Sequence, residues 1–170
     1  MEFSHKCWNP LGELSFIIGN DEIVYLRRCC FLEPFLKLSI QDFLKIEDPF
    51  KLAQESEKPI IKDSHKDFCK VCYLPKTIEK VTIGLSKACP LNCYHCFYEK
   101  NHRDTLEIKK LYFSTLEKVK GHHLREIRLN DRGEPFYYYN ETIKYLRSLS
   151  LEDTQVVSFI TSLSTLNESR

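Results

Sequence analysis

The sequence predicts an α/β protein, with a parallel sheet in its second half and a small cysteine-rich α+β module in front of it. From residue 81 onward, strand-like and helix-like segments alternate, which is typical of a parallel sheet with crossover helices. Ahead of that region, two short β-branched segments flank a turn, as in a hairpin. Closely spaced cysteines occur in both regions. We therefore divide the chain into a module of residues 1–78 and an α/β domain of residues 79–170.

The predicted hairpin of the module consists of Leu14 to Ile18 and Ile23 to Leu26, joined by a turn that begins at Gly19. The turn sequence is Gly-Asn-Asp, and these residue types favour hairpin turns. Two short helices are expected next, at Ser39 to Ile46 and at Pro49 to Ser56. A proline suits the first position of the second helix.

The α/β domain is expected to follow the order strand, helix, strand, helix, strand. A capping box of Asp104 and Glu107 predicts the start of the first helix, and Gly121 predicts its end. The apolar face of this helix consists of Ile108, Leu111, Tyr112, Thr115, Leu116 and Val119. The other expected elements are strands at Val81 to Leu85, Leu124 to Leu129 and Gln155 to Ile160, and a capped helix at Asn140 to Ser148.

The composition is that of an ordinary soluble chain. Lys and Arg number 25 against 24 Asp and Glu, so the formal charge of +1 gives no general attraction to nucleic acid or to an anionic membrane. No apolar run reaches the roughly 20 residues of a spanning helix, and the N-terminus lacks a secretory signal. We expect a cytoplasmic protein without a membrane partner. A basic stretch from Lys118 to Arg128, with His122 and His123, is interpreted first as a solvated face and otherwise as a contact for an anionic substrate.

Three cysteines, Cys89, Cys93 and Cys96, lie on one short segment between a predicted strand and a predicted helix. Cysteine thiolates are the standard ligands of iron–sulfur clusters. A four-iron cluster held by three of them keeps its fourth iron open to a ligand from outside the protein, much as a catalytic zinc keeps an open position. The alternative is a structural zinc site completed by His95 or His102.

The spacing CxxxCxxC after the first strand of a parallel sheet resembles the defining motif of the radical S-adenosylmethionine superfamily. The resemblance implies a 4Fe-4S cluster whose open iron binds S-adenosylmethionine. It also implies that His95, the residue before the last cysteine, lies near the adenine.

A second segment, Asn130 to Pro135, resembles the GGEP motif that holds the methionine moiety in that superfamily. Gly133 permits close backbone approach, and the peptide groups of Gly133 and Glu134 can bond the amino group of the cosubstrate. Arg132 stands where the family has its first glycine, and Pro135 completes the motif. Glu134 as a general base is the alternative. Phe159 to Ser162, at the end of the third predicted strand, is a weaker similarity to a Thr-Asn-Gly segment of relatives.

The first half resembles the SPASM or twitch type of auxiliary-cluster domain. The resemblance implies that Cys7, Cys29, Cys69 and Cys72 hold a second cluster. Cys30 is the alternative to Cys29, because neighbouring strand residues point to opposite faces. A zinc ribbon built from the same cysteines is the other interpretation. In the family such domains usually follow the barrel, whereas here the module precedes it.

The resemblance implies a partial (β/α)6 barrel with about three of its strands. It implies reductive cleavage of S-adenosylmethionine to a 5′-deoxyadenosyl radical for hydrogen abstraction, with flavodoxin or ferredoxin as electron donor and a peptide as substrate. No catalytic side chain is assigned. Since the family barrel has six strands, we expect a truncated chain, a fragment or a chain completed by a partner. The alternative is a noncatalytic iron–sulfur or zinc module that transfers electrons or binds a partner.

Overall fold

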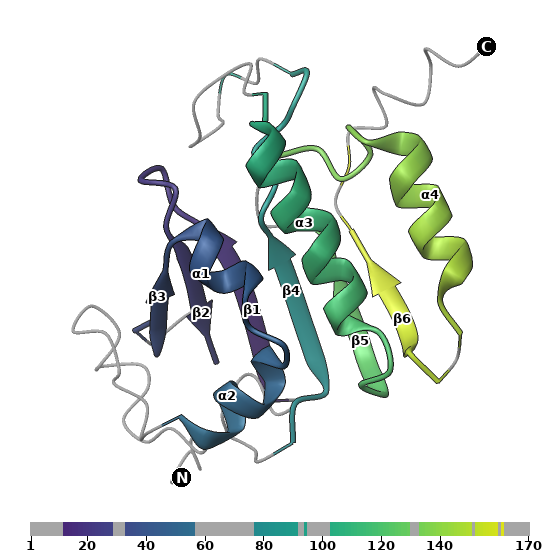
Figure 1. The fold of residues 1–170 in the computed structure, drawn as a ribbon. Helices are drawn as coiled ribbons and strands as arrows, with labels where there is room; N and C mark the ends of the chain where they lie inside the picture. Colours follow the sequence, from purple (N-terminus) through teal and green to yellow (C-terminus); the bar gives the residue numbers. More distant parts are fainter. Residues whose placement is uncertain are drawn as a thin grey trace, which may run out of the picture.

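The computed structural model describes residues 12–28, 33–56, 77–91, 94, 103–129, 133–150, 152–159 and 161. Within these ranges the chain forms a six-stranded mixed sheet and four helices (Figure 1). The strands are β1 (Glu13–Ile18), β2 (Val24–Arg27), β3 (Leu36–Leu38), β4 (Lys80–Gly84), β5 (Leu124–Arg128) and β6 (Thr154–Ser158). The helices are α1 (Ile40–Leu44), α2 (Pro49–Glu55), α3 (Leu106–Val119) and α4 (Tyr139–Ser148). The predicted α/β class is confirmed.

The strand order is β3-β2-β1-β4-β5-β6, so the hairpin and the βαβ region share one sheet. β1 and β2 pair antiparallel, which confirms the predicted hairpin. β1 also pairs parallel with β4, with Glu13 opposite Lys80. The predicted boundary between residues 78 and 79 therefore falls between two strands that lie side by side. The short strand β3 was not predicted.

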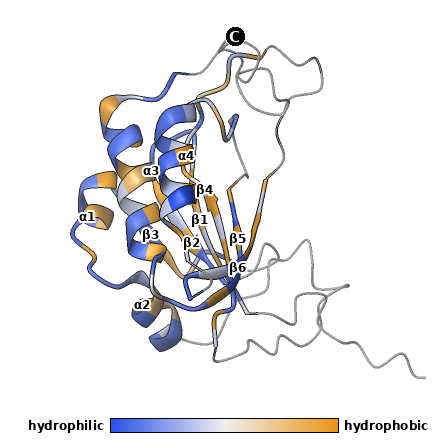
Figure 2. Cartoon of the chain, turned by 90° about the vertical axis from the view of Figure 1, so that its right-hand side faces the viewer, coloured by the Kyte–Doolittle hydropathy of each residue, from blue (hydrophilic) through white to orange (hydrophobic). Residues whose placement is uncertain are grey.

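β4, β5 and β6 are parallel neighbours in chain order, and α3 and α4 are their crossover helices. Figure 2 shows α1, α3 and α4 on one side of the sheet. Both crossovers therefore cover the same face, as in a singly wound sheet, whereas a doubly wound sheet has helices on both faces. Within the described ranges, no helix has the length and apolar character that a membrane span requires.

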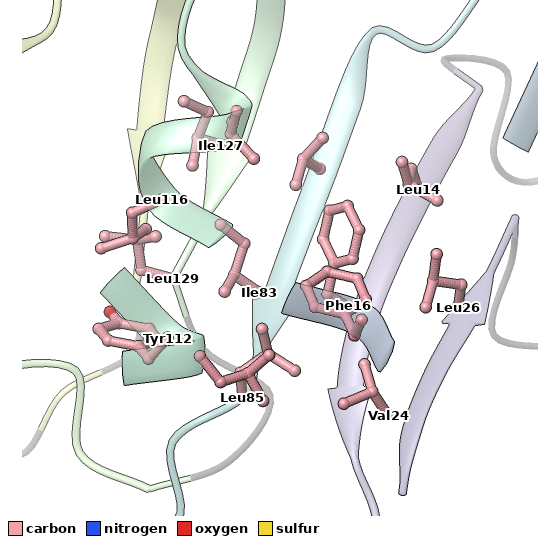
Figure 3. Packing of buried hydrophobic residues seen from close by; sticks show 14 of the residues in the cluster. Leu14, Phe16, Val24, Leu26, Ile83, Leu85, Tyr112, Leu116, Ile127 and Leu129 are labelled. Atoms are coloured by element: carbon pink, nitrogen blue, oxygen red, sulfur yellow. The ribbon is translucent and has the colours of Figure 1, made fainter. Parts of the chain in front are cut away.

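One hydrophobic cluster joins the hairpin to the rest of the sheet beneath the helices. Alternate residues of each strand point to the same face, and those facing the helices are apolar. Figure 3 shows Leu14, Phe16, Val24 and Leu26 of the hairpin beside Ile83, Ile127, Tyr112 and Leu116 of the βαβ region. Because these side chains are at most 4% exposed, the described parts of both halves depend on the same core.

The face of the sheet opposite this core is largely polar. The strand registers place Arg27, Ser15, Thr82, Arg128 and Ser158 in one row across five strands. Hydrogen bonds tie this row to the row below it, where the Thr82 hydroxyl donates to the Glu13 carboxylate at 2.6 Å. The described strands thus combine an apolar face under the helices with a hydrogen-bonded polar face on the other side.

The helix starts differ from the predicted caps. α3 is capped by Thr105, whose side chain accepts a hydrogen bond from the backbone N–H of Ile108. The predicted capping box of Asp104 and Glu107 is therefore wrong, because the Asp104 carboxylate accepts hydrogen bonds from other segments. The cap predicted for α4 is also wrong: this helix begins one residue earlier, and its N-cap Tyr138 makes no side-chain capping bond.

Candidate functional site

Three segments meet where the parallel strands β4, β5 and β6 end. They are residues 85–89 after β4, residues 133–138 after β5, and Phe159 with Thr161 after β6. Carboxyl ends of parallel strands lie at one edge of a sheet, where α/β proteins commonly bind ligands. Cys89 and the Gly-Glu-Pro segment, which the sequence singled out separately, therefore share one edge.

The residues leading to Cys89 are fixed by the carboxylate of Asp104. The Ser86 hydroxyl donates to it at 2.6 Å and the backbone N–H of Lys87 at 2.8 Å. The hydroxyl of Tyr138 donates to the same carboxylate at 3.0 Å. Asp104 precedes the N-cap of α3, so one side chain connects the start of the cysteine segment, the start of α3 and the start of α4.

The backbone around Gly133 lies directly against the cysteine segment. The Glu134 N–H donates to the Ala88 carbonyl at 2.8 Å. Gly133 has φ +66°, a region that favours glycine, and a Cβ atom there would lie 2.7 Å from the Ala88 oxygen and 2.9 Å from the Ser86 oxygen. Glycine is thus required here both by the backbone conformation and by the close approach of another backbone.

The side chain of Glu134 connects to the third segment. Glu134 is 4% exposed, and its carboxylate accepts hydrogen bonds from the Thr161 hydroxyl and, at 3.4 Å, from the Phe136 N–H. The rings of Phe136 and Phe159 pack edge to face with centroids 4.8 Å apart. The weak sequence similarity at Phe159 to Ser162 therefore coincides with contacts to residues 133–138 at both of its described residues, Phe159 and Thr161.

The turn after Glu134 is anchored on α4 and α3. The buried Thr142 hydroxyl donates to the carbonyl of Pro135 at 3.2 Å. Burial raises the pKa of Tyr112 and of Tyr138, and for Tyr138 the nearby Asp104 carboxylate adds to the effect. Both phenols therefore remain protonated donors at neutral pH. They border a cavity of about 10 Å³ between Ser86 and Glu134, room for about one water molecule.

The described residues contain only part of the predicted site. Cys89 is half-buried at the end of the anchored segment, and Gly133, Glu134 and Pro135 lie beside that segment. Cys93, His95, Cys96 and Arg132 lie outside the described residues, as do Cys7, Cys29, Cys30, Cys69 and Cys72. Among the residues that are described, no three His, Cys, Asp or Glu side chains are grouped to hold a metal ion.

Sequence reasoning missed the residues that connect the three segments. Asp104 was read as a helix cap, and Ser86 and Tyr138 were not singled out. The order of the strands was the available signal, because it places residues 85–89 and 133–138 at the same edge. Asp104 and Thr105 are adjacent at the start of α3, and both residue types are common N-caps. Thr105 is the N-cap in the structure.

Comparisons of the chain with models of protein families, with curated proteins and with solved structures give no match.

Proposed function

We propose that this chain is a radical S-adenosylmethionine protein that holds a 4Fe-4S cluster and cleaves S-adenosylmethionine reductively. One observation carries the proposal: the Gly133–Glu134 backbone is hydrogen-bonded to Ala88, the residue before the first cysteine of CxxxCxxC. The two motifs come from different strands, and nothing in their separate sequences requires them to touch. Their contact supports a shared role in binding one cosubstrate.

The described residues fit such a cofactor. Cys89 follows three consecutive residues whose backbone or side-chain groups are hydrogen-bonded. These bonds fix the position of the backbone that carries the first thiolate ligand. Cys89, Cys93 and Cys96 would hold the cluster, and Gly133, Glu134 and Pro135, with Arg132 and His95, would contact S-adenosylmethionine. A bound cluster would supply the electron that cleaves S-adenosylmethionine into methionine and a 5′-deoxyadenosyl radical, which removes a hydrogen atom from the substrate.

The chain's own residues position these groups. Asp104 fixes the entry of the cysteine segment against α3 and α4, and Gly133 lets the next loop approach it. The backbone of Glu134 would contact the cosubstrate. Its buried carboxylate accepts hydrogen bonds from the Thr161 hydroxyl and the Phe136 N–H. The parallel order of β4, β5 and β6, with both crossover helices on one face, supports the opening part of a (β/α)6 barrel. The polar face would then line its interior and meet the substrate.

The test is anaerobic reconstitution of the full chain with iron and sulfide, followed by addition of a reductant and S-adenosylmethionine. We expect a brown protein that forms 5′-deoxyadenosine and binds about four iron atoms for each cluster. Replacing Cys89, Cys93 and Cys96 together by Ala is expected to abolish 5′-deoxyadenosine formation. The matched control is the pair Cys69→Ala and Cys72→Ala, which belongs to the proposed auxiliary cluster and should lower iron content while leaving some cleavage.

A colourless, zinc-replete and air-stable protein would overturn the proposal. A protein that assembles a cluster through the same three cysteines, yet neither binds nor cleaves S-adenosylmethionine, would instead be a noncatalytic electron-transfer or partner-binding module. Measuring cosubstrate binding by equilibrium dialysis separates these outcomes from a simple failure of the reductant.

A further inference from the structure

A second pocket lies at the opposite edge of the parallel strands, where they begin. Its volume is about 640 Å³, within the range typical of small-molecule sites. Its polar lining comes from Glu79, Arg125, Gln155, Gln54, Thr77, His122 and His123. The pocket is thus built from β5 and β6, from the segment before β4, from α2 and from the turn before β5, all of them outside the candidate site described above.

Strand pairing sets three of these side chains next to one another. The backbone N–H of Arg125 donates to the Glu79 carbonyl at 2.8 Å, and the pairing of Leu124 with Thr154 places Gln155 opposite Arg125. Residues two positions apart share a face of a sheet, so this row continues the helix-covered face. At the amino edge the apolar face therefore ends in a row of polar groups.

The turn that forms another wall is held in place by its own contacts. The His122 ring stacks on Phe50 of α2, with centroids 3.7 Å apart and planes inclined by 11°. The backbone N–H of Gly121 donates to the Asp153 carboxylate at 2.8 Å. His123 has φ +50°, so its backbone conformation is set by the turn. Much of this wall is therefore formed before any ligand arrives.

The lining contains an excess of hydrogen-bond donors. One guanidinium, two imidazoles, two amides and one hydroxyl belong to the lining residues, together with one carboxylate, that of Glu79. No ion pair occupies Arg125 in the described part of the chain. A planar guanidinium binds oxyanions through two parallel N–H donors, and a phosphate group offers three further acceptor oxygens to the donors around it.

We propose that this pocket binds the phosphate group of a small phosphorylated molecule, with Arg125 as its principal contact and His123 and the two glutamines as further donors. The site is separate from the iron–sulfur chemistry, since it lies at the other edge of the sheet and shares no residue with it. It also gives the basic stretch from Lys118 to Arg128 a binding role in place of a purely solvated one.

Acid pH strengthens the expected binding. Burial lowers the pKa of His122, the charge of Asp48 opposes this effect and His123 reinforces it. His122 is therefore neutral near pH 7 and gains a positive charge as the pH falls, next to Arg125, His123 and Glu79. Sulfate is the suitable probe for this effect, because its own charge is constant between about pH 5 and pH 8.

The experiment is isothermal titration of the full chain with inorganic phosphate at pH 7, and with sulfate at about pH 5 and pH 8. We expect saturable binding with a Kd below about 10 mM and tighter sulfate binding at the lower pH. Arg125→Gln should weaken phosphate binding at least about tenfold. His123→Asn, which suits the left-handed backbone, should weaken it less.

Arg147→Gln is the matched control, because Arg147 is an exposed arginine on α4 that lines a surface depression formed by that helix alone. It should leave binding unchanged. Absence of saturable binding by the unmodified chain, or an equal loss in Arg147→Gln, would overturn the proposal. If Arg125→Gln does not fold, Arg125→Lys replaces it as the test variant. Lysine keeps the positive charge but lacks the planar guanidinium with its two parallel N–H donors, so phosphate binding should still be weaker.

Discussion

The backbone N–H of Glu134 donates a 2.8 Å hydrogen bond to the carbonyl of Ala88, so the loop after β5 is fastened to the segment that leads to Cys89. Through this bond, a change in either segment is transmitted to the other. The bond also explains why both loops need tightly specified residues: Gly133 for the approach, and Asp104 to hold the segment that is approached.

Gly133→Ala should destabilise the protein by about 3 kcal/mol, because it adds left-handed backbone strain and a collision with the Ala88 carbonyl. Gly121→Ala is the matched control. Gly121 also has a positive φ, of +80°, but nothing lies within 4 Å of its added Cβ, so only the strain of about 1 kcal/mol applies. Urea unfolding of the two variants measures the difference, and equal losses would contradict the close approach.

Asp104→Ala should lower the free energy of unfolding by about 3 kcal/mol, because Ser86, Lys87 and Tyr138 each lose the acceptor of a hydrogen bond. We also expect lower iron incorporation, since the cysteine segment loses its anchor. Thr105→Ala removes the helix cap next to it and should cost about 1 kcal/mol without affecting iron content. Denaturant unfolding and iron analysis of both variants check this. If Thr105→Ala lowers iron content as much, Asp104 has no special role.

Thr161→Val should weaken the protein by about 1–2 kcal/mol, because the buried Glu134 carboxylate loses the donor that Thr161 provides. Thr161→Ser keeps the hydroxyl and should retain most of the stability. Thermal unfolding compares the two. The prediction fails if the serine variant is as unstable as the valine variant, since the lost contact would then be the methyl group and not the hydrogen bond.

The stability contributed by Glu126 should disappear in acid. Burial acts to raise the pKa of Glu126, but the Ser158 hydrogen bond and the charges of Lys80 and Arg128 outweigh it and hold the pKa below its ordinary value. The folded state therefore favours the ionised form. This contribution is complete above the unfolded pKa of about 4.3 and is lost as the pH falls through the lower folded value.

Glu126→Gln should accordingly cost about 1–2 kcal/mol at pH 7 and progressively less below about pH 4. The Glu126 side chain is 18% exposed and its partner Lys80 12%, so solvent screens the pair only partly. Glu117→Gln is a suitable comparison, because Glu117 is 65% exposed and its pair with Lys120 is worth little. Urea midpoints across this pH range provide the test, and a cost that grows in acid would refute it.

The local elements were largely predictable from the sequence. All six residues expected on the apolar face of α3 are buried, and Gly121 follows its end with a positive φ. The hairpin and the starts of α1 and α2 agree with the predictions within one residue, because period and turn chemistry act over few positions. β3 escaped prediction since three residues, with Lys37 between two leucines, are too short to establish a period.

The relationships between distant segments were less accessible. The order of the motifs predicted that Cys89 and Gly133 belong to neighbouring strand ends. Nothing in the residues around Asp104 indicates that its carboxylate accepts hydrogen bonds from the Ser86 and Tyr138 hydroxyls. These bonds depend on how α3 and α4 pack on the sheet. The pairing of β1 with β4 likewise reflects burial of a shared apolar face, which no local pattern specifies.

The parallel pairing of β1 with β4 has a consequence for the order in which the protein folds. Thr82 bonds to Glu13 across 69 positions of sequence, so a newly made hairpin has no neighbour on that side until β4 has left the ribosome. In the interval, the unpaired backbone edge of β1 is exposed to other chains. Rapid synthesis through this stretch, or a chaperone that shields the hairpin, would thus raise the yield of native protein.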